Sequence, residues 1–367
     1  MTHDFAPKLA RVLTEYCRPV KPGDYVLVMA SVAAEPIVEA LWEEIVKKGG
    51  NPSLSMSFPS LGEIFMKHAT EAQFDFIDPA LWTQFDKADV LYSIRAPTNT
   101  KRFSRVSAAR MARQHAGQRP LFERYLARCE HDDIRWNITG WPTQAGAQDA
   151  EMGLLEYTEF MYRAAGLDRT DPVAYWQEFQ ERQAVLVEWL KGKQHAEIHG
   201  PGIEMSFDFG GRSWVSCHGI KNFPDGEIFT APVEDSVNGT VAFSFPTVYG
   251  GRELNGVRLV FERGCVVEAH AEKGDDYLQS QLQMDEGAKR LGEFAIGTNM
   301  GIQEFTREIL FDEKIGGTIH MALGEQADGA GGVNKSVIHW DMVHNMKDGG
   351  EVIIDGELFY RGGEFMV

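Results

Sequence analysis

The sequence is poor in cysteine. Its 367 residues contain only four, Cys17, Cys129, Cys217 and Cys265, and no two of them have CxxC spacing. Scattered cysteines argue against a disulfide framework and against a thiolate zinc site. Because free thiols suit a reducing compartment, we expect a cytoplasmic protein.

Basic residues and long apolar runs are also scarce. The chain has 36 Lys and Arg against 54 Asp and Glu, which gives a formal net charge of -18. An anionic protein repels a phosphate backbone, so nucleic acid is a poor partner and a peptide or small molecule is favoured. No segment approaches the roughly 18 consecutive apolar residues of a membrane span, and the N-terminus lacks the pattern of a secretory signal. We therefore expect no membrane partner and an intracellular protein.

The first half of the chain alternates short apolar runs with segments of helical periodicity. The expected strands cover residues 25–29, 54–58, 88–94 and 134–139, and the expected helices cover residues 35–48, 63–75, 104–128, 148–165 and 172–191. Such alternation predicts an α/β fold with a doubly wound parallel sheet. With 43% hydrophobic residues, a chain of this length is more often two domains than one. We assign residues 1–194 to an N-terminal doubly wound α/β domain.

The second half has a different texture. Gly-rich turns separate short β-type runs at residues 204–209, 214–217, 240–245, 257–261 and 266–271. One helix is expected, over residues 277–295. This pattern predicts a mixed α+β domain over residues 195–367, with the domain boundary within residues 192–202.

Residue types that bind divalent metals concentrate in this second domain. His339 and Asp341 stand two apart in a strand-like run. Side chains at i and i+2 of a strand point to the same face, so this imidazole and this carboxylate should converge. His320 lies in another strand-like run, where a polar ring among apolar neighbours needs a partner. For either histidine alone, a hydrogen-bonded core residue is the alternative.

Two carboxylates extend this set. Glu293 falls near the C-terminus of the expected helix, where the backbone dipole disfavours an anion unless a cation such as a metal ion compensates. Glu227 follows a Pro-Asp-Gly turn and begins an apolar run. The alternatives are a solvated helix glutamate for the first and a surface charge beside a turn for the second.

Four segments of the second half together resemble the aminopeptidase T family of two-metal metallopeptidases. They are PDGEIFTAPVEDSVNG (224–239), DEGAKRLGEFAIGTN (285–299), LFDEKIGGTIHMALG (310–324) and GGVNKSVIHWDMV (331–343). The resemblance implies two divalent metal ions (Zn, Co, Mn or Mg), with Glu293 bridging them. It implies the ligands Glu227, Glu293, His320, His339 and Asp341.

The resemblance also implies an activity. A metal-activated water would hydrolyse the N-terminal residue of a short peptide, in a homodimer with an enclosed active site. Mixed carboxylate and imidazole ligation with open positions suits such metal-assisted hydrolysis. The general base is open: Glu286 and Glu313 are the candidates, and a surface charge is the alternative for each.

One position departs from the family pattern. A tyrosine is expected seven residues after His320, and here that position is Ala327. Loss of a donor that stabilises a tetrahedral oxyanion costs about 10²–10³ in rate in other enzymes. Asp328, Gln326 or Tyr249 could substitute for the missing phenol.

Two other interpretations stay open. A degenerate enzyme would bind metal tightly without turnover. A mononuclear Fe(II) ring-cleaving dioxygenase would use His320, His339 and Asp341 as a facial triad. Glu227 and Glu293 would then be surplus, and metal content separates the two-metal hydrolase from the one-iron enzyme.

Overall fold

The structure is a computed structural model that describes residues 4–131 and 133–367, and it divides into two compact units. The first comprises the chain up to Trp176 together with Gly219–Phe223, and the second comprises Gln177–His218 and Pro224–Val367. Whether residues 1–194 and 195–367 fold as independent domains stays a prediction. Among the described residues, no helix combines the length and the apolar content that crossing a bilayer requires.

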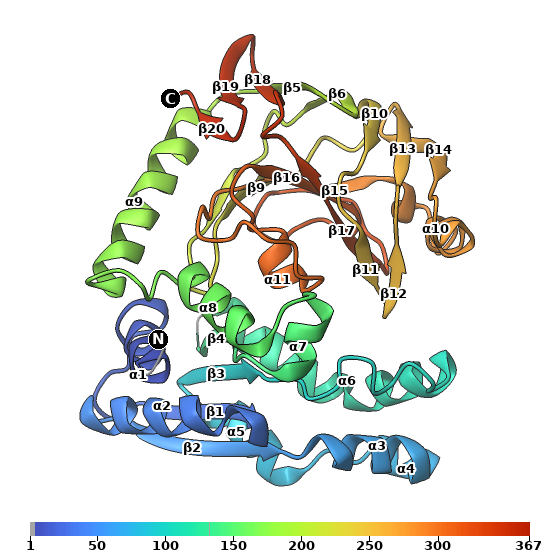
Figure 1. The fold of residues 1–367 in the computed structure, drawn as a ribbon. Coiled ribbons are helices and arrows are strands. Elements are labelled where there is room, and N and C mark those ends of the chain that lie inside the picture. Colours follow the sequence, from blue (N-terminus) through green and yellow to red (C-terminus); the bar gives the residue numbers. More distant parts are fainter. Residues whose placement is uncertain (1–3, 132) are drawn as a thin grey trace. The chain divides into compact units, whose positions relative to one another are not determined.

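The first unit is built on a five-stranded parallel sheet in the order β2-β1-β3-β4-β8, of which β1, β2, β3 and β4 are labelled in Figure 1. Its strands are β1 (Tyr25–Ser31), β2 (Asn51–Ser57), β3 (Val90–Arg95), β4 (Arg135–Gly140) and β8 (Asn222–Phe223). Val26, Leu27 and Val28 of β1 are fully buried, as expected for a parallel strand covered on both faces. The chain adds β2 on one side of β1 and then β3 and β4 on the other, which is a doubly wound order. The predicted fold class is confirmed.

Helices precede, connect and follow the first four of these strands, and the last helix continues into the second unit (Figure 1). They are α1 (Phe5–Val12), η1 (Leu13–Cys17), η2 (Val32–Ala34), α2 (Glu35–Lys47), α3 (Pro59–His68), α4 (Glu71–Phe74), α5 (Pro79–Lys87), α6 (Ala108–Glu130), α7 (Gln144–Asp149), α8 (Leu154–Ala164) and α9 (Pro172–Leu190). The helix predicted over residues 148–165 is in fact two helices, because Glu151 adopts a left-handed φ of 58° and Glu156 caps the backbone N–H of Gly153. The helix predicted over residues 63–75 breaks in the same way, at the capping box of Thr70 and Gln73.

The second unit contains two larger antiparallel sheets and a short hairpin. An eight-stranded sheet has the order β14-β13-β10-β6-β5-β18-β19-β20, and a five-stranded sheet has the order β17-β16-β15-β9-β7. The first consists of β5 (His195–Gly200), β6 (Ile203–Asp208), β10 (Asn238–Ala242), β13 (Arg258–Glu262), β14 (Cys265–His270), β18 (Glu351–Ile354), β19 (Glu357–Arg361) and β20 (Glu364–Phe365). The second consists of β7 (Val215–Cys217), β9 (Glu227–Thr230), β15 (Leu291–Gly297), β16 (Thr318–Gly324) and β17 (His339–Asn345). The hairpin pairs β11 (Thr247–Tyr249) with β12 (Arg252–Leu254).

The five-stranded antiparallel sheet of the second unit has one apolar face. Side chains alternate between the two faces of a strand, and alternate residues of β9, β15, β16 and β17 supply eight members of the main hydrophobic core. These residues are Ile228, Phe294, Ile296, Ile319, Met321, Leu323, Trp340 and Met342. The residues between them therefore project from the opposite face.

The helix predicted over residues 277–295 is wrong beyond its first third. Helix α10 spans Asp275–Leu282, a 3-10 turn η3 spans Gly287–Lys289, and Leu291–Gly297 is strand β15. All seven residues of β15 are buried between β9 and β16. A fully buried central strand is a continuous apolar run, which periodicity alone does not distinguish from a buried helix segment. Glu293 therefore lies within a strand and not near a helix C-terminus, and the predicted effect of a helix dipole on it is wrong.

A β-bulge in β15 sets the direction of Glu293. Leu291 and Glu293 stand two residues apart and would ordinarily share a face, but the register with β16 shifts between them. Leu291 consequently packs in the core, while Glu293 points to the other face. A side chain on the intervening Gly292 would collide with the carbonyl oxygens of Gly324 and Glu325. Bulges of this kind re-aim side chains next to functional sites.

Candidate metal centre

The five residues predicted to bind metal all lie on one face of the five-stranded antiparallel sheet of the second unit, the face opposite its hydrophobic core. Glu227 begins β9, Glu293 lies in β15, His320 lies in β16, and His339 and Asp341 lie in β17. The strand register places Asp341 opposite Ala322, which in turn is opposite Glu293, and Ala295 is opposite His320. Four adjacent strands thus bring together residues that are up to 114 positions apart in the chain, from 227 to 341.

The donor atoms of these residues form two sets that share one member. The first set is Glu227, Glu293 and His320, and the second is Glu293, His339 and Asp341; within each set the donor atoms lie within 4.8 Å of one another. His320 Nε2 lies 3.3 Å from Glu227 Oε2 and 3.4 Å from Glu293 Oε1. His339 Nε2 lies 3.5 Å from both Glu293 Oε2 and Asp341 Oδ1. Each carboxylate oxygen of Glu293 therefore faces a different histidine.

Several of these donor atoms are buried without a hydrogen bond. Glu227, Glu293 and His320 are 5%, 6% and 1% exposed. Among the described residues, Glu227 Oε2, His320 Nε2 and Asp341 Oδ1 have no hydrogen-bond partner. A buried polar atom without a partner is costly. Four atom pairs at 3.3–3.5 Å are also wider than charged hydrogen bonds, which are about 2.7–2.9 Å long.

These residues fit divalent metal ions. Ligand atoms about 2.0–2.1 Å from a tetrahedral ion lie about 3.3–3.4 Å from one another, close to the spacing of these donors. Carboxylate and imidazole groups together suit Zn²⁺ and similar divalent ions. The second ring nitrogen of His339 contacts the carbonyl oxygen of Glu325 at 2.8 Å. This contact directs Nε2 toward the cluster, as second contacts of metal-binding histidines commonly do.

The charges in the cluster shift the pKa values of its members. Burial lowers the pKa of His320, but the carboxylates of Glu293 and Glu227 outweigh burial and raise it to about 9. Burial likewise opposes protonation of His339, yet Asp341 and Glu293 raise its pKa to about 10. Burial would raise the pKa of Asp341, and the His339 imidazolium instead lowers it to about 2. The last two shifts describe the same ion pair seen from its two partners. In the metal-free protein both histidines are therefore protonated at neutral pH.

The two candidate general bases lie in different surroundings: one adjoins the cluster and the other is exposed. Glu313 follows α11 (Ile309–Asp312) and forms a group of potential donor atoms with His320 and Asp341. Burial raises the pKa of Glu313 to about 7, against the opposing effect of Lys314. Glu286 is exposed at the start of η3 and belongs to none of the donor groups among the described residues.

Lys314 is a member of the site that the sequence analysis missed. It is 1% exposed, and its ammonium pairs with Glu227 at 2.9 Å, with Asp225 at 3.7 Å and with Glu313. A lysine is almost never fully buried unless it is paired. Its only signal in the sequence is its place between Glu313 and a Gly-rich turn, which by itself predicts a surface charge.

Ala327 lies beside the metal-binding face. It is buried in a small apolar cluster with Phe229, Ala231, Ala295 and Ala330. Tyr249, one proposed substitute for the missing phenol, stacks on Trp340 with ring centroids 5.1 Å apart. Trp340 belongs to the core face of β17, so the ring of Tyr249 packs on the side opposite to the metal-binding residues.

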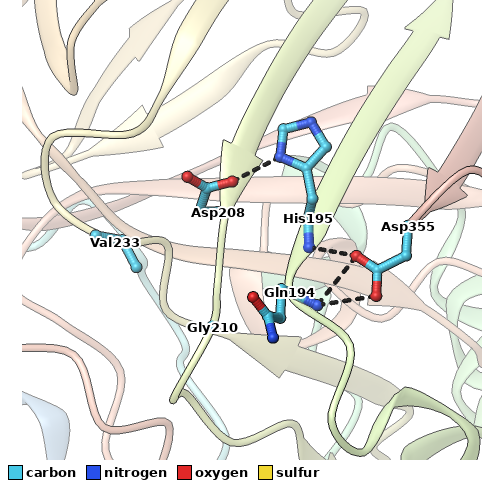
Figure 2. A pocket seen from close by; sticks show the side chains of 6 residues that line it. All are labelled: Gln194, His195, Asp208, Gly210, Val233 and Asp355. Atoms are coloured by element: carbon cyan, nitrogen blue, oxygen red, sulfur yellow. Dashed lines mark hydrogen bonds and ion pairs between the residues drawn. The ribbon is translucent and has the colours of Figure 1, made fainter.

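The second unit also has a surface cavity of about 530 Å³, lined by Gln194, His195, Asp208, Gly210, Val233 and Asp355 (Figure 2). Its polar groups are already engaged with one another. Asp208 contacts His195 Nδ1 at 2.6 Å, and Asp355 accepts hydrogen bonds from the backbone N–H groups of Gln194 and His195. None of the five predicted metal ligands lines this cavity, so it is a feature separate from the cluster.

Carboxylates and imidazoles gathered on one sheet face, three of them buried and several with donor atoms that lack a hydrogen bond among the described residues, define this protein as a candidate metalloenzyme. The sequence profile of the thermophilic metalloprotease (M29) family matches residues 3–365, and the chain belongs to this family. Membership makes it a hydrolase and implies a divalent metal. The family resemblance seen in the four sequence segments is thereby confirmed.

Individual relatives agree with this assignment. Aminopeptidase 2 of Geobacillus stearothermophilus is 28% identical over 369 residues, which cover 90% of this chain and 89% of that protein. Aminopeptidase T of Thermus thermophilus is 31% identical over 227 residues, or 54% of each chain. The solved structure of wild-type AmpT from Thermus thermophilus matches 100% of both chains with a TM-score of 0.86 at 23% identity, which establishes the shared fold.

We predict that metal-free protein loses stability as the pH rises from about 6.5 to about 10. The pKa values of His320 and His339 are raised from an ordinary 6.5 to about 9 and about 10. The stabilisation from their protonated rings is therefore complete below pH 6.5 and is lost as the pH rises through 9 and 10. Thermal unfolding of chelator-treated protein across this range measures the effect.

Because metal displaces these protons, we also predict that calorimetric heats of metal binding at pH 7 depend on the ionisation enthalpy of the buffer.

A pair of variants controls this prediction. His339→Gln should reduce the dependence on buffer, whereas His270→Gln, at an exposed histidine of β14, should leave it unchanged. Heats that are the same in all buffers would contradict the protonated state of the cluster.

Proposed function

We propose that the protein is a metal-dependent aminopeptidase that removes N-terminal residues from short peptides with two divalent ions bound in this cluster. The observation that carries the proposal is the position of Glu293, whose two oxygens face two different histidines at 3.4 and 3.5 Å. Glu227 and His320 would hold one ion, His339 and Asp341 the other, and Glu293 would serve both. Five donors in two overlapping sets support a dinuclear centre over a mononuclear iron triad, in which Glu227 and Glu293 would be surplus.

The roles of the remaining groups follow from their positions. A pair of divalent ions lowers the pKa of a bound water and polarises a substrate carbonyl. Glu313 adjoins His320 and Asp341 and has a pKa of about 7, so it can both accept and release a proton near neutral pH. We assign Glu313 the transfer of the proton from water to the leaving amine. Glu286, which is exposed, has no such role.

The absence of a phenol at Ala327 favours a slow enzyme as the second candidate. Ala327 is packed among other small residues and offers no hydrogen-bond donor to a tetrahedral oxyanion. The expected penalty is about 10²–10³ in rate, and a protein that binds metal without turnover is the limiting case.

Metal content and activity test the proposal together. Metal-free protein reconstituted with Zn²⁺, Co²⁺, Mn²⁺ or Mg²⁺ should bind two equivalents per chain and release free amino acids from aminoacyl amides and short peptides. Glu293→Gln should lose most of the metal and the activity, because it removes a charged ligand from both donor sets. Two bound ions without release of amino acids with any metal would leave the degenerate enzyme, and a single oxygen-sensitive iron would overturn the two-ion centre.

A matched pair of glutamate variants tests the proton-transfer group. Glu313→Gln should lower kcat by about 10²–10⁴ while two metal equivalents stay bound. Glu286→Gln makes the same chemical change at an exposed position and should leave kcat and KM within about twofold, as surface substitutions usually do. Equal effects of the two variants would contradict the role of Glu313.

We further infer that the protein acts in the cytoplasm as a homodimer. The four cysteines are free thiols, which supports a reducing compartment. Phe58, Leu61 and Ile64, spaced three apart at the start of α3, are 54%, 59% and 55% exposed, and aligned exposed apolar side chains support a protein interface.

Light scattering should give a mass of twice 41.1 kDa, and Leu61→Asp should shift the mass toward that of the monomer. A wild-type monomer at all concentrations would contradict the dimer.

A further inference from the structure

The ammonium of Lys314 makes the two oxygens of Glu227 inequivalent. Lys314 Nζ donates to Glu227 Oε1 at 2.9 Å. The other oxygen, Glu227 Oε2, has no hydrogen-bond partner among the described residues and faces His320 Nε2 at 3.3 Å. One oxygen is therefore held by the lysine, while the other is directed to the imidazole.

The lysine cannot move away from this position at low cost. Lys314 is 1% exposed, and its ammonium is surrounded by the carboxylates of Glu227, Asp225 and Glu313. Removing one partner of a buried ion pair leaves uncompensated charge, which is strongly destabilising. The backbone of Glu227 is also fixed, since Gln183 Nε2 donates to its carbonyl oxygen at 3.1 Å. Both the main chain and one side-chain oxygen of Glu227 are thus anchored.

Only one of the two donor sets has this arrangement. Lys314 pairs with Glu227, a member of the set with His320, and it forms no ion pair with Glu293 or Asp341 among the described contacts. The set of His339 and Asp341 instead has its orienting contact at the Glu325 carbonyl oxygen. An effect of the lysine on ligation should therefore be confined to the ion held by Glu227 and His320.

We propose that Lys314 is a positioning residue that restricts Glu227 to one-oxygen ligation and thereby sets the affinity of the Glu227–His320 ion alone. The inference rests on the proposed two-ion site. By occupying Oε1, the ammonium leaves Oε2 as the single oxygen that Glu227 offers, and it pre-orients that oxygen toward the position beside His320. A free glutamate would have to lose rotamer freedom when the ion binds, and second contacts that orient a ligand are typically worth 10–100-fold in metal affinity.

Stepwise metal titration of the full-length protein tests this role. Metal-free protein titrated with Co²⁺ should show two binding steps. Lys314→Met should weaken one step by about 10–100-fold and leave the other within about threefold. Lys314→Arg keeps a cation and should recover part of the loss. Lys335→Met, at an exposed lysine of the same unit, serves as the matched control and should change neither step.

The Co²⁺ absorption spectrum gives a second readout that does not involve activity. A Glu227 carboxylate released from the lysine can bind with both oxygens, which raises the coordination number of one ion, and higher coordination weakens the visible d–d bands of Co²⁺. We expect the bands of the weaker step alone to lose intensity in Lys314→Met. A variant that is merely less stable would bind both ions with unchanged spectra.

A charge-balanced variant keeps the test valid if Lys314→Met does not fold. Asp225→Asn/Lys314→Met removes one carboxylate together with the ammonium, so the buried excess of negative charge does not grow, and its titration should show the same selective weakening. Unchanged affinities and spectra in the folded variants would overturn the positioning role while the two-ion proposal stands. Fewer than two ions in the wild-type protein would instead overturn the two-ion site itself.

Discussion

The site depends on the alternation of side chains across one antiparallel sheet. Residues of β9, β15, β16 and β17 that point one way form the core of the second unit, and the residues between them carry the carboxylates and imidazoles. Because the alternation has a period of two residues, a slip by one residue in any of the four strands would bury a charge in the core. Burial of the apolar face therefore also fixes the direction of the polar groups.

Among the described strand pairings of this sheet, the register shifts only at the bulge around Gly292. Without the extra residue, Leu291 and Glu293 would project to the same side, and either a leucine would enter the polar cluster or a carboxylate would enter the core. The register shift resolves the conflict, and close contact with the carbonyl oxygens of Gly324 and Glu325 requires glycine there. A small backbone irregularity thus places the only residue common to both donor sets.

The sequence allowed four of the five strands of the first sheet and the candidate ligands to be predicted, but not β8 or the contacts that position the candidate ligands. Spacing of two residues correctly put His339 and Asp341 on one face, because a strand's periodicity is local. The four motif segments selected Glu227, Glu293 and His320, which the structure places around the same point. Periodicity misassigned β15 as helix, since a strand buried on both faces shows no alternation in composition. The role of Lys314 depends on contacts with residues up to 89 positions away, from 225 to 314, and these appear only in the fold.

The balance of charge links the protonation of the cluster to the proposed pair of ions. The carboxylates of Asp225, Glu227, Glu293, Glu313 and Asp341 and the ammonium of Lys314 leave an excess of four negative charges when every carboxylate is ionised. Two divalent cations would balance this excess, and a single one would not. In the metal-free protein, protons balance part of this negative charge. The raised pKa values of His320 and His339 keep both imidazoles protonated at neutral pH, and burial raises the pKa of Glu227 and of Glu313. A cluster whose negative charge is partly balanced by protons should exchange them for cations as the pH rises.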